Sequence, residues 1–291
     1  MTVTGSPGSD RLRRVVDRIQ GLPTLPAMLS SINRLMVNPR TSAKEIAQLI
    51  SSDPAITSKV LRVVNSSFYG FPNRISTVTH AIVILGFNTI RSIVLSTSIF
   101  DALRKSQPSH GFDRAAFWRH SIGTGACSRV LARKLGFTAL EEFFIAGLLH
   151  DVGKIALDSY LPEDFGKVVA KVREADITML EAEEAVLGVN HADVGGWLLQ
   201  KWSLSQGLVD AVARHHSPAL AGENLKPAAI VHFGDMLARA LQIGSGGDRR
   251  MPTLSDEAWT VLGIGTDSFP ALLAEGSEEA DRAMVFLEFA R

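Results

Sequence analysis

Apolar residues recur along this chain at intervals of three and four positions, which is the spacing of one helical face. Val15, Val16 and Ile19 form one such set, and a second set runs from Pro26 to Met36. This periodicity is typical of helices that bury a single face. No segment alternates apolar and polar residues over more than a few positions. The pattern therefore predicts an all-α protein.

Local signals mark where two of these helices begin. Thr41 or Ser42, followed by Glu45, resembles a capping box, in which the two side chains bond each other's backbone N–H groups. Asp53 followed by Pro54 is typical of an N-cap residue and the first helical position. We therefore expect one helix to start just after residue 42 and another at Pro54.

Breaks in the pattern predict how the helices are grouped. Gly86 separates two apolar segments, 78–85 and 88–103. Polar breaks follow at 105–113 and at 243–253, and we expect the break at 243–253 to be flexible. The other helices are expected at 114–135, 139–150, 162–175, 178–188, 191–201, 205–216 and 226–242, with two or three short ones in the tail. The result is a two-lobed helical bundle with a disordered N-terminus (1–14), an N-terminal lobe (15–105), a second lobe (112–242) and a C-terminal helical tail (243–291).

Composition narrows the class of protein. Thirty basic and thirty acidic residues give a net charge of zero, so no overall field attracts nucleic acid, and direct nucleic-acid binding is not expected. The single cysteine, Cys127, excludes an internal disulfide and is most simply a small buried side chain. The first residues lack the apolar core of a signal peptide, and the uninterrupted apolar stretches are short. We expect a soluble cytoplasmic protein with no membrane association.

An aromatic turn, Asn65–Pro72, interrupts the helical pattern in the first lobe. Phe68, Tyr69 and Phe71 stand beside Gly70 and Pro72, which should stop any helix. Clustered aromatic side chains are seldom exposed on a monomer. We expect this turn to pack against the second lobe or, less favourably, to bind another protein.

Most of the candidate chemistry lies beyond position 119. The string LLHDVGK places a histidine and an aspartate at the end of an apolar helical segment, where an ionisable group is costly unless it is paired or binds a metal. Further histidines and an aspartate open, close or interrupt other helices. The candidate metal ligands are His120, His150, Asp151, His191, His215, His216 and Asp235.

Residues from separate helices can build a metal site in the core of a bundle. Imidazole and carboxylate ligands without thiolate suit one or two divalent transition ions, namely Fe, Mn, Zn, Co or Ni. Two such ions would activate water and hold a phosphate. Lys154 follows Asp151 by three residues and would supply positive charge to a phosphoryl oxygen, so Asp151 and Lys154 are the candidate catalytic residues.

A simpler interpretation applies to each residue alone. A single histidine on an apolar face is more often a hydrogen-bonded core residue than a ligand, and the whole set could form a buried polar network without metal. His80 and His110 have the surroundings of surface histidines, and Arg249 with Arg250 reads as a solvated pair. His232, three residues before Asp235, is a candidate for supporting the ligands rather than being one.

Long strings in this sequence resemble the HDOD domain, a bacterial signalling module related to HD-domain phosphohydrolases. The matching strings are LPTLPAMLSSINRLM, IAQLISSDPAITSKVLRVVNSSFYG, ISTVTHAIVILGFNTIRSIVLS, FWRHS, FIAGLLHDVGK, HADVGGWLLQKW, ARHH and HFGD. The resemblance covers about residues 15–245. It implies an N-terminal HDOD lobe and an HD-like lobe, and it matches each of the seven candidate ligands to a metal-ligand position of the HD pattern.

What the resemblance implies for function is divided. HDOD domains mostly serve as regulatory or scaffolding modules that have lost some HD ligands, whereas this chain retains the full set and Lys154. After His216 the sequence reads SPAL, without the acidic residue and GYP triplet of cyclic di-GMP phosphodiesterases. We expect a bacterial signal-transduction protein with a metal site and a signalling protein partner. The alternative is an active metal-dependent phosphohydrolase that binds a nucleotide, a cyclic dinucleotide or a phosphomonoester.

Overall fold

The structure, a computed structural model, describes residues 7–19, 28–29, 31–32, 35, 41–103 and 111–289. Within these ranges every regular element is a helix and no strand occurs, so the prediction of an all-α fold is confirmed. The α-helices are α1 (Pro7–Arg18), α3 (Ala43–Ser51), α4 (Pro54–Val64), α5 (Val78–Leu103), α6 (Arg114–Lys134), α7 (Leu140–Leu149), α8 (Val152–Tyr160), α9 (Pro162–Ala175), α10 (Met179–Leu187), α11 (His191–Lys201), α12 (Gln206–Ala213), α13 (Leu225–Ala240), α14 (Asp256–Leu262) and α15 (Phe269–Ala283). Short 3-10 helices are η1 (Pro218–Asn224), η2 (Thr266–Ser268) and η3 (Met284–Phe289). Most of the helix predicted from Pro26 and the residue His110 lie outside the described residues.

The predicted start signals of α3 and α4 are confirmed. Ser42 caps α3: its hydroxyl accepts from Glu45 N at 3.3 Å, and the Glu45 carboxylate accepts from Ser42 N at 2.7 Å. Asp53 caps α4 by accepting from the backbone N–H groups of the second and third residues after it, and Pro54 occupies the first turn. These bonds satisfy N–H groups that a helix leaves without partners.

Helix α5 is broken at Gly86, as the sequence predicts. Gly86 has φ 81° and ψ 164°, a conformation that a residue with a side chain rarely adopts. Taken as one element, α5 is long and apolar enough to cross a membrane. The uninterrupted apolar stretches of the sequence do not predict such a helix, because polar residues interrupt α5. However, 56% of its most apolar window is buried inside the protein. Its second half is therefore a core helix.

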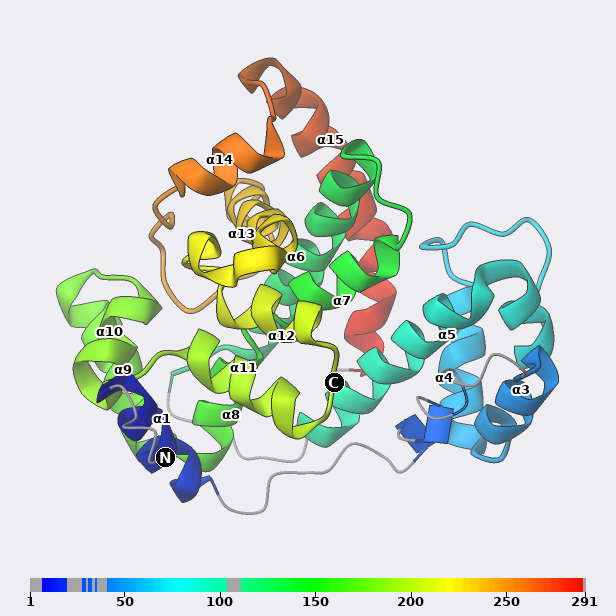
Figure 1. Ribbon diagram of the computed structural model, residues 1–291, viewed down its shortest axis with the longest axis horizontal. Coiled ribbons are helices and arrows are strands. Elements are labelled where there is room, and N and C mark those ends of the chain that lie inside the picture. The colour runs from blue at the N-terminus through cyan, green and yellow to red at the C-terminus, as the bar shows by residue number, and fades with distance from the viewer. Residues whose placement is uncertain are drawn as a thin grey trace.

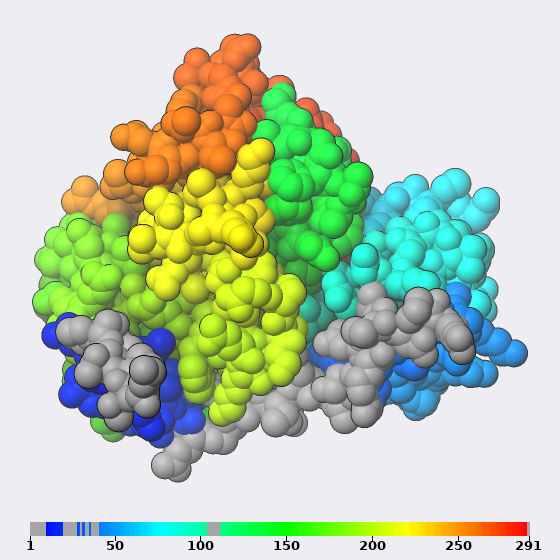
Figure 2. Space-filling view, in the orientation of Figure 1, coloured from blue at the N-terminus to red at the C-terminus, as the bar shows by residue number. Residues whose placement is uncertain are grey.

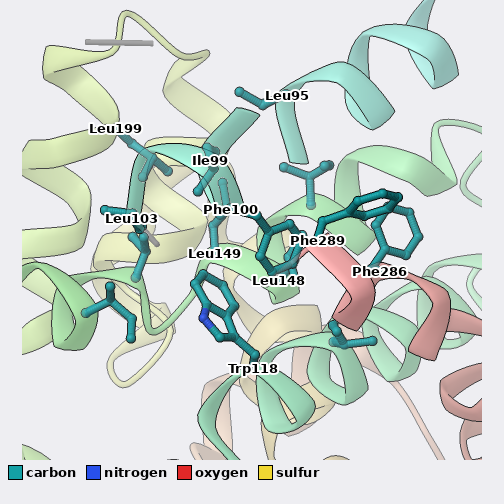
Figure 3. Packing of buried hydrophobic residues seen from close by; sticks show 14 of the residues in the cluster. Leu95, Ile99, Phe100, Leu103, Trp118, Leu148, Leu149, Leu199, Phe286 and Phe289 are labelled. Atoms are coloured by element: carbon teal, nitrogen blue, oxygen red, sulfur yellow. The ribbon is translucent and has the colours of Figure 1, made fainter. Parts of the chain in front are cut away.

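That second half of α5 connects the N-terminal helices to the rest of the molecule. Figure 3 shows Phe100 of α5 beside Trp118 of α6, with Leu148 and Leu149 of α7 close by. Phe286 and Phe289 of η3 complete the same buried cluster, which contains residues from both lobes. A second cluster lies between α6, α13, α14 and α15. Because the main core is continuous, the C-terminal residues 269–289 pack as part of the bundle rather than as an appended tail.

The N-terminal segment differs from its prediction. The expectation that residues 1–14 are disordered is wrong from Pro7 onward, where α1 begins. Val15, Val16 and Ile19 are buried, and Arg18 pairs with Asp164 of α9 at 2.5 Å. Figures 1 and 2 show α1 beside α9–α11, on the side of the molecule opposite α3–α5. Helix α1 therefore packs beside α9 and α11 rather than beside α3–α5.

The aromatic turn packs against the second lobe. Phe68 is 5% exposed, and its ring centroid lies 5.1 Å from that of Phe144 in α7 and 5.5 Å from that of Phe286. The Tyr69 hydroxyl donates to Glu141 at 3.2 Å. Of the two interpretations of this turn, the structure favours the plug between lobes.

Helix α8 is missing from the sequence prediction. It follows α7 after only two residues, and every residue from Val152 to Asp158 is buried. A helix that is buried on all sides has no polar face, so periodicity cannot reveal it. Its presence turns His150 and Asp151 into the junction between two buried helices.

Candidate metal centre

The seven candidate ligands come from five places in the fold and meet at one point. His120 lies in the middle of α6, His150 and Asp151 form the α7–α8 junction, and His191 is the first residue of α11. His215 and His216 follow α12, and Asp235 lies in α13. All are buried except His216, which is partly exposed. Side chains up to 115 residues apart in sequence thus share one buried space.

The ligand atoms form two adjoining groups. In the first, Asp151 lies with His191, His215 and His216, and in the second, His120 and His150 lie with Asp235. Within each group all ligand atoms lie within 4.8 Å of one another. Each group could therefore hold one metal ion.

Asp151 lies between the two groups. Its Oδ1 is 3.0 Å from Nε2 of His191 and 3.7 Å from Nε2 of His215. Its Oδ2 is 3.2 Å from Nε2 of His150 in the other group. Each of its oxygens thus faces one group, which is the arrangement expected of a carboxylate that bridges two ions.

Hydrogen bonds to Nδ1 fix how three of the imidazoles point. Nδ1 of His150 lies 2.7 Å from the carbonyl oxygen of Gly147, and Nδ1 of His215 lies 2.7 Å from that of Val212. A carbonyl only accepts, so Nδ1 of each of these two rings carries a proton and donates it. Nδ1 of His191 lies 2.6 Å from the Glu183 carboxylate. Such contacts are the ones that orient histidine ligands of metals.

Four buried polar atoms at the centre make no hydrogen bond of regular geometry among the described residues, although Nε2 of His120 lies 2.9 Å from Asp235 Oδ1 and Oδ1 of Asp151 lies 3.0 Å from Nε2 of His191. They are Nε2 of His120, Nε2 of His150, Nε2 of His215 and Oδ1 of Asp151. Leaving even one such group unsatisfied costs about 1–3 kcal/mol. A cluster of such atoms around one point suits the binding of a cation better than a closed hydrogen-bond network, so the residues present fit a metal ion.

The carboxylates of the centre are held in their ionised form. Burial alone would raise the pKa of Asp151, but His150 and Lys154 together hold that pKa well below its usual range. For Asp235, burial is likewise outweighed by Arg239 and by His120, whose Nε2 lies 2.9 Å away, so the pKa of Asp235 is also well below normal. Ionised carboxylates are the form that binds metal.

The imidazoles differ from one another. Burial holds the pKa values of His215 and His216 well below normal, so both are neutral, as metal ligands must be. Burial would also lower the pKa of His191, but the Glu183 carboxylate raises it above its usual value. Without a metal, a proton on His191 would therefore be shared with Glu183 and Asp151.

The Lys154 ammonium group is held by two partners within the protein. Its Nζ donates to Asp151 Oδ2 at 2.6 Å and to the carbonyl oxygen of Gly246 at 2.9 Å. The expected turn-apart spacing from Asp151 is confirmed, because the two are joined by an i,i+3 ion pair. Lys154 thus ties the centre to the segment between α13 and α14.

Two residues that contact candidate ligands, Glu183 and Arg239, are not predicted from the sequence. Glu183 is fully buried, and its carboxylate accepts from both the backbone N–H and Nδ1 of His191. Arg239 donates to Asp235 at 2.9 Å and to Asp248 at 2.8 Å. The sequence contains one signal for each of them. Glu183 is an acid on the buried face of α10, and Arg239 follows Asp235 by four residues, the spacing of side-chain pairs on a helix.

Four further expectations concern His232, the segment 243–253, Arg250 and His80. Nδ1 of His232 lies 2.8 Å from the His215 carbonyl, so His232 supports a candidate ligand, as expected. The segment 243–253 was expected to be a flexible break, but it lies against the centre through Gly246 and Asp248. Arg250 is not simply solvated, because it pairs with Asp176 at 2.6 Å, whereas His80 is exposed as predicted.

Comparison with known proteins places this arrangement in a family. A curated relative, an uncharacterised protein of Treponema pallidum (strain Nichols), is 29% identical over 229 residues, which are 78% of this chain and 44% of that protein. The chain thus spans less than half the length of that relative. An HDOD domain protein of unknown function from Geobacter sulfurreducens has the same fold, with 27% identity, a TM-score of 0.80, and 95% of this chain and 96% of the other covered.

A more distant structure shares the fold alone. It is a proposed phosphohydrolase from Shewanella amazonensis SB2B, 22% identical, with a TM-score of 0.73 and 97% of this chain and 98% of the other covered. The family model of the HDOD domain matches residues 22–218, which are more than half of the sequence. The chain therefore belongs to the HDOD domain family.

Proposed function

We propose that this chain is a bacterial signal-transduction protein whose HD-like lobe binds one or two divalent transition-metal ions. The observation that supports it most is the gathering of seven imidazole and carboxylate side chains into two adjoining groups, in which four buried atoms make no hydrogen bond of regular geometry among the described residues. His191, His215 and His216 with Asp151 would hold one ion, and His120, His150 and Asp235 would hold a second, with Asp151 between them. Iron, manganese, zinc, cobalt and nickel all accept such ligands.

Membership of the HDOD family supports the signalling role. The lobe that contains α3–α5 would act as the interaction module, and the HD-like lobe as the part that senses metal or ligand. The signal would pass to a protein partner in the cytoplasm. One remote structural neighbour, from Marinobacter aquaeolei VT8, is named as a proposed signal transduction protein, but at 20% identity it supports the fold alone.

Metal content of the purified protein tests this proposal. Wild-type protein should carry metal after loading with each candidate ion, and Asp151→Asn should lose most of it, because Asp151 faces both groups. His80→Ala is the matched control, since His80 is exposed and lies outside the centre. Circular dichroism checks that each variant is folded. Equal metal in wild type and Asp151→Asn, or none in either after loading, contradicts the proposal.

A second function, metal-dependent phosphohydrolysis, has one specific observation in its favour. A cavity of about 190 Å³ opens beside the centre and is lined by Lys154, His191 and His216. A bound divalent ion would supply Lewis acidity toward water and a phosphoryl oxygen. Lys154 would neutralise charge on that oxygen, and Glu183 would orient His191. A panel of phosphomonoesters, nucleotides and cyclic dinucleotides, assayed with the loaded protein, tests this function, and turnover unchanged in Lys154→Met would exclude the role of Lys154.

A further inference from the structure

A second and larger cavity lies where α5 meets α7 and α12, and the proposed function does not use it. Its volume is about 630 Å³. The described residues that line it come mainly from the second half of α5, from α7, and from α12 with the loop before it, and Figure 1 shows α7 between α5 and α12. None of the seven candidate ligands lines this cavity, so it is separate from the candidate metal centre.

The walls of this cavity are mostly apolar. They include Leu95 of α5, Phe143 and Ile145 of α7, and Leu204 and Leu208 in and before α12. Leu95 and Phe143 are 8% and 7% exposed, and Leu204 and Leu208 are only partly buried. An apolar molecule in the cavity would remove this remaining apolar surface from water, which favours binding.

The cavity offers no unpaired charge among the described residues that line it. Its two charged side chains, Arg91 and Glu142, pair with each other at 3.5 Å. An anionic ligand would compete with Glu142 for Arg91, and a cationic ligand would compete with Arg91 for Glu142. A neutral ligand meets no such competition, so the charges of the lining favour a neutral molecule.

One nearly buried polar side chain in the lining is free to bind a ligand. Ser92 of α5 is 6% exposed, and its hydroxyl makes no hydrogen bond in the described part of the chain. Most buried polar side chains do have a partner. Because a hydroxyl both donates and accepts, a polar group at one end of a ligand would supply that partner.

The volume sets the size of the ligand. About 630 Å³ lies within the roughly 300–1,000 Å³ of pockets that enclose small organic molecules, and such pockets combine apolar walls with a few polar groups. At about 30 Å³ for each non-hydrogen atom, the share of one water molecule in the liquid, the cavity holds about twenty such atoms.

We infer that this cavity binds a neutral, mostly apolar organic molecule of about twenty non-hydrogen atoms, with one polar end that forms a hydrogen bond with Ser92. The inference goes beyond the proposed function. It does not depend on a bound metal, because the cavity and the candidate metal centre share no candidate ligand.

Fluorescence titration with the neutral probe phenylnaphthylamine tests the inference. This probe has two apolar aromatic groups and one N–H group, and its fluorescence rises when it leaves water. It should bind saturably to the whole chain. Leu208→Trp, which places a larger side chain in the lining, should weaken binding about tenfold or more. Leu220→Trp is the matched control, because Leu220 is 68% exposed and lies outside the lining, and it should leave binding unchanged.

Two serines of α5 test the polar contact. The Ser92 and Ser98 hydroxyls both lack a hydrogen-bond partner in the described part of the chain, but of the two residues only Ser92 lines the cavity. Ser92→Ala should weaken probe binding about threefold to tenfold, the scale of one neutral hydrogen bond, whereas Ser98→Ala should change it less than about twofold. Equal effects of the two substitutions overturn the assigned contact.

The charge of the ligand is tested with anilinonaphthalenesulfonate, which has the same aromatic groups and a negative charge. It should bind about tenfold more weakly than the neutral probe, and equal or tighter binding overturns the inference of a neutral ligand. No saturable binding of the neutral probe, or unchanged binding in Leu208→Trp, overturns the site itself. Thermal denaturation checks that each variant is folded, and if Leu208→Trp does not fold, the two serine variants decide.

Every titration is repeated on metal-loaded and on chelator-treated protein. Probe binding in protein that takes up no metal contradicts the proposed metal centre and supports this cavity site. Metal uptake without probe binding has the opposite meaning, so the failure of one proposal is distinguishable from the failure of the other.

Discussion

Arg129 occupies the junction between the aromatic turn and the second lobe, and its removal should be costly. It pairs with Glu141 at 3.2 Å and, at closer range, with Glu279. Its guanidinium carbon lies 4.6 Å from the centre of the Phe68 ring. The Arg129 and Glu141 side chains are each 13% exposed and that of Glu279 is 3% exposed. One arginine thus pairs with a buried acid of α15 and with a partly buried acid of α7.

The magnitude follows from this burial. Removing one partner of a buried ion pair costs about 3–5 kcal/mol, because the other charge stays buried without compensation. Here Tyr69 still donates to Glu141, and Arg282 still donates to Glu279, which reduces the loss. The lost contact with the Phe68 ring adds about 0.5–2 kcal/mol. We expect Arg129→Met to lower the free energy of unfolding by about 3–5 kcal/mol.

Arg133→Met is the matched control. Arg133 contacts the same Glu279 oxygen at 3.4 Å, but its side chain is 45% exposed. An exposed pair contributes about 0–1 kcal/mol. Urea denaturation followed by tryptophan fluorescence measures both variants. If Arg129→Met costs no more than Arg133→Met, the buried network does not hold the lobes together and this reasoning is wrong.

Three further perturbations test other parts of the structure. A Cβ on Gly153 would lie 2.0 Å from the His191 carbonyl oxygen, so Gly153→Ala should displace α8 from α11. It should lower the free energy of unfolding by about 1–3 kcal/mol and reduce the bound metal. The control, Gly166→Ala, adds a Cβ in open space and should leave the bound metal unchanged and the stability unchanged or higher. Burial raises the pKa of the Cys127 thiol to about 12, so Cys127 should resist a thiol reagent at pH 8 until urea unfolds the protein, and rapid labelling of native protein would contradict its burial. Although burial would raise the pKa of Glu279, Arg282 and Arg129 hold this pKa below the ordinary value of 4.5. The ionised Glu279 therefore stabilises the folded protein above about pH 4.5, and this stabilisation is lost as the pH falls through the lower pKa of the folded state. The stability difference between wild type and Glu279→Gln should therefore shrink below about pH 4.5 in pH-dependent denaturation, and a constant difference would refute the shift.

The features that the sequence predicts well are those set by local chemistry. The Ser42–Glu45 capping box and the Asp53 cap depend on residues within three positions of each other, and the structure contains both. The break at Gly86 depends on a conformation that one residue type favours. The candidate ligands are recognisable because histidine and aspartate are costly to bury, so their presence in apolar helices already indicates a site.

The features that the sequence misses depend on contacts between distant segments. Helix α8 has no polar face, because neighbouring helices surround it, and its pattern is invisible until those neighbours are known. Glu183 and Arg239 belong to residue types that usually lie on the surface. Their roles depend on contacts with α11 and with the segment after α13, which the sequence alone does not predict. Helix α1 contacts α9 through a hydrogen bond from Arg18 to Asp164, which lies 146 residues further along the chain, so its position is not predictable from local sequence.

Helix α7 links the contact between the lobes to the candidate metal centre. Near its start, Glu141 and Phe144 receive Tyr69 and Phe68 from the aromatic turn. Its last turn supplies the Gly147 carbonyl that orients His150, the next residue after the helix. Seven consecutive residues of α7, from Phe143 to Leu149, are buried, so the helix cannot tilt at one end without disturbing its packing at the other. The same helix therefore contacts the aromatic turn near its start and orients His150 at its end, so a substitution that shifts α7 is expected to change both contacts.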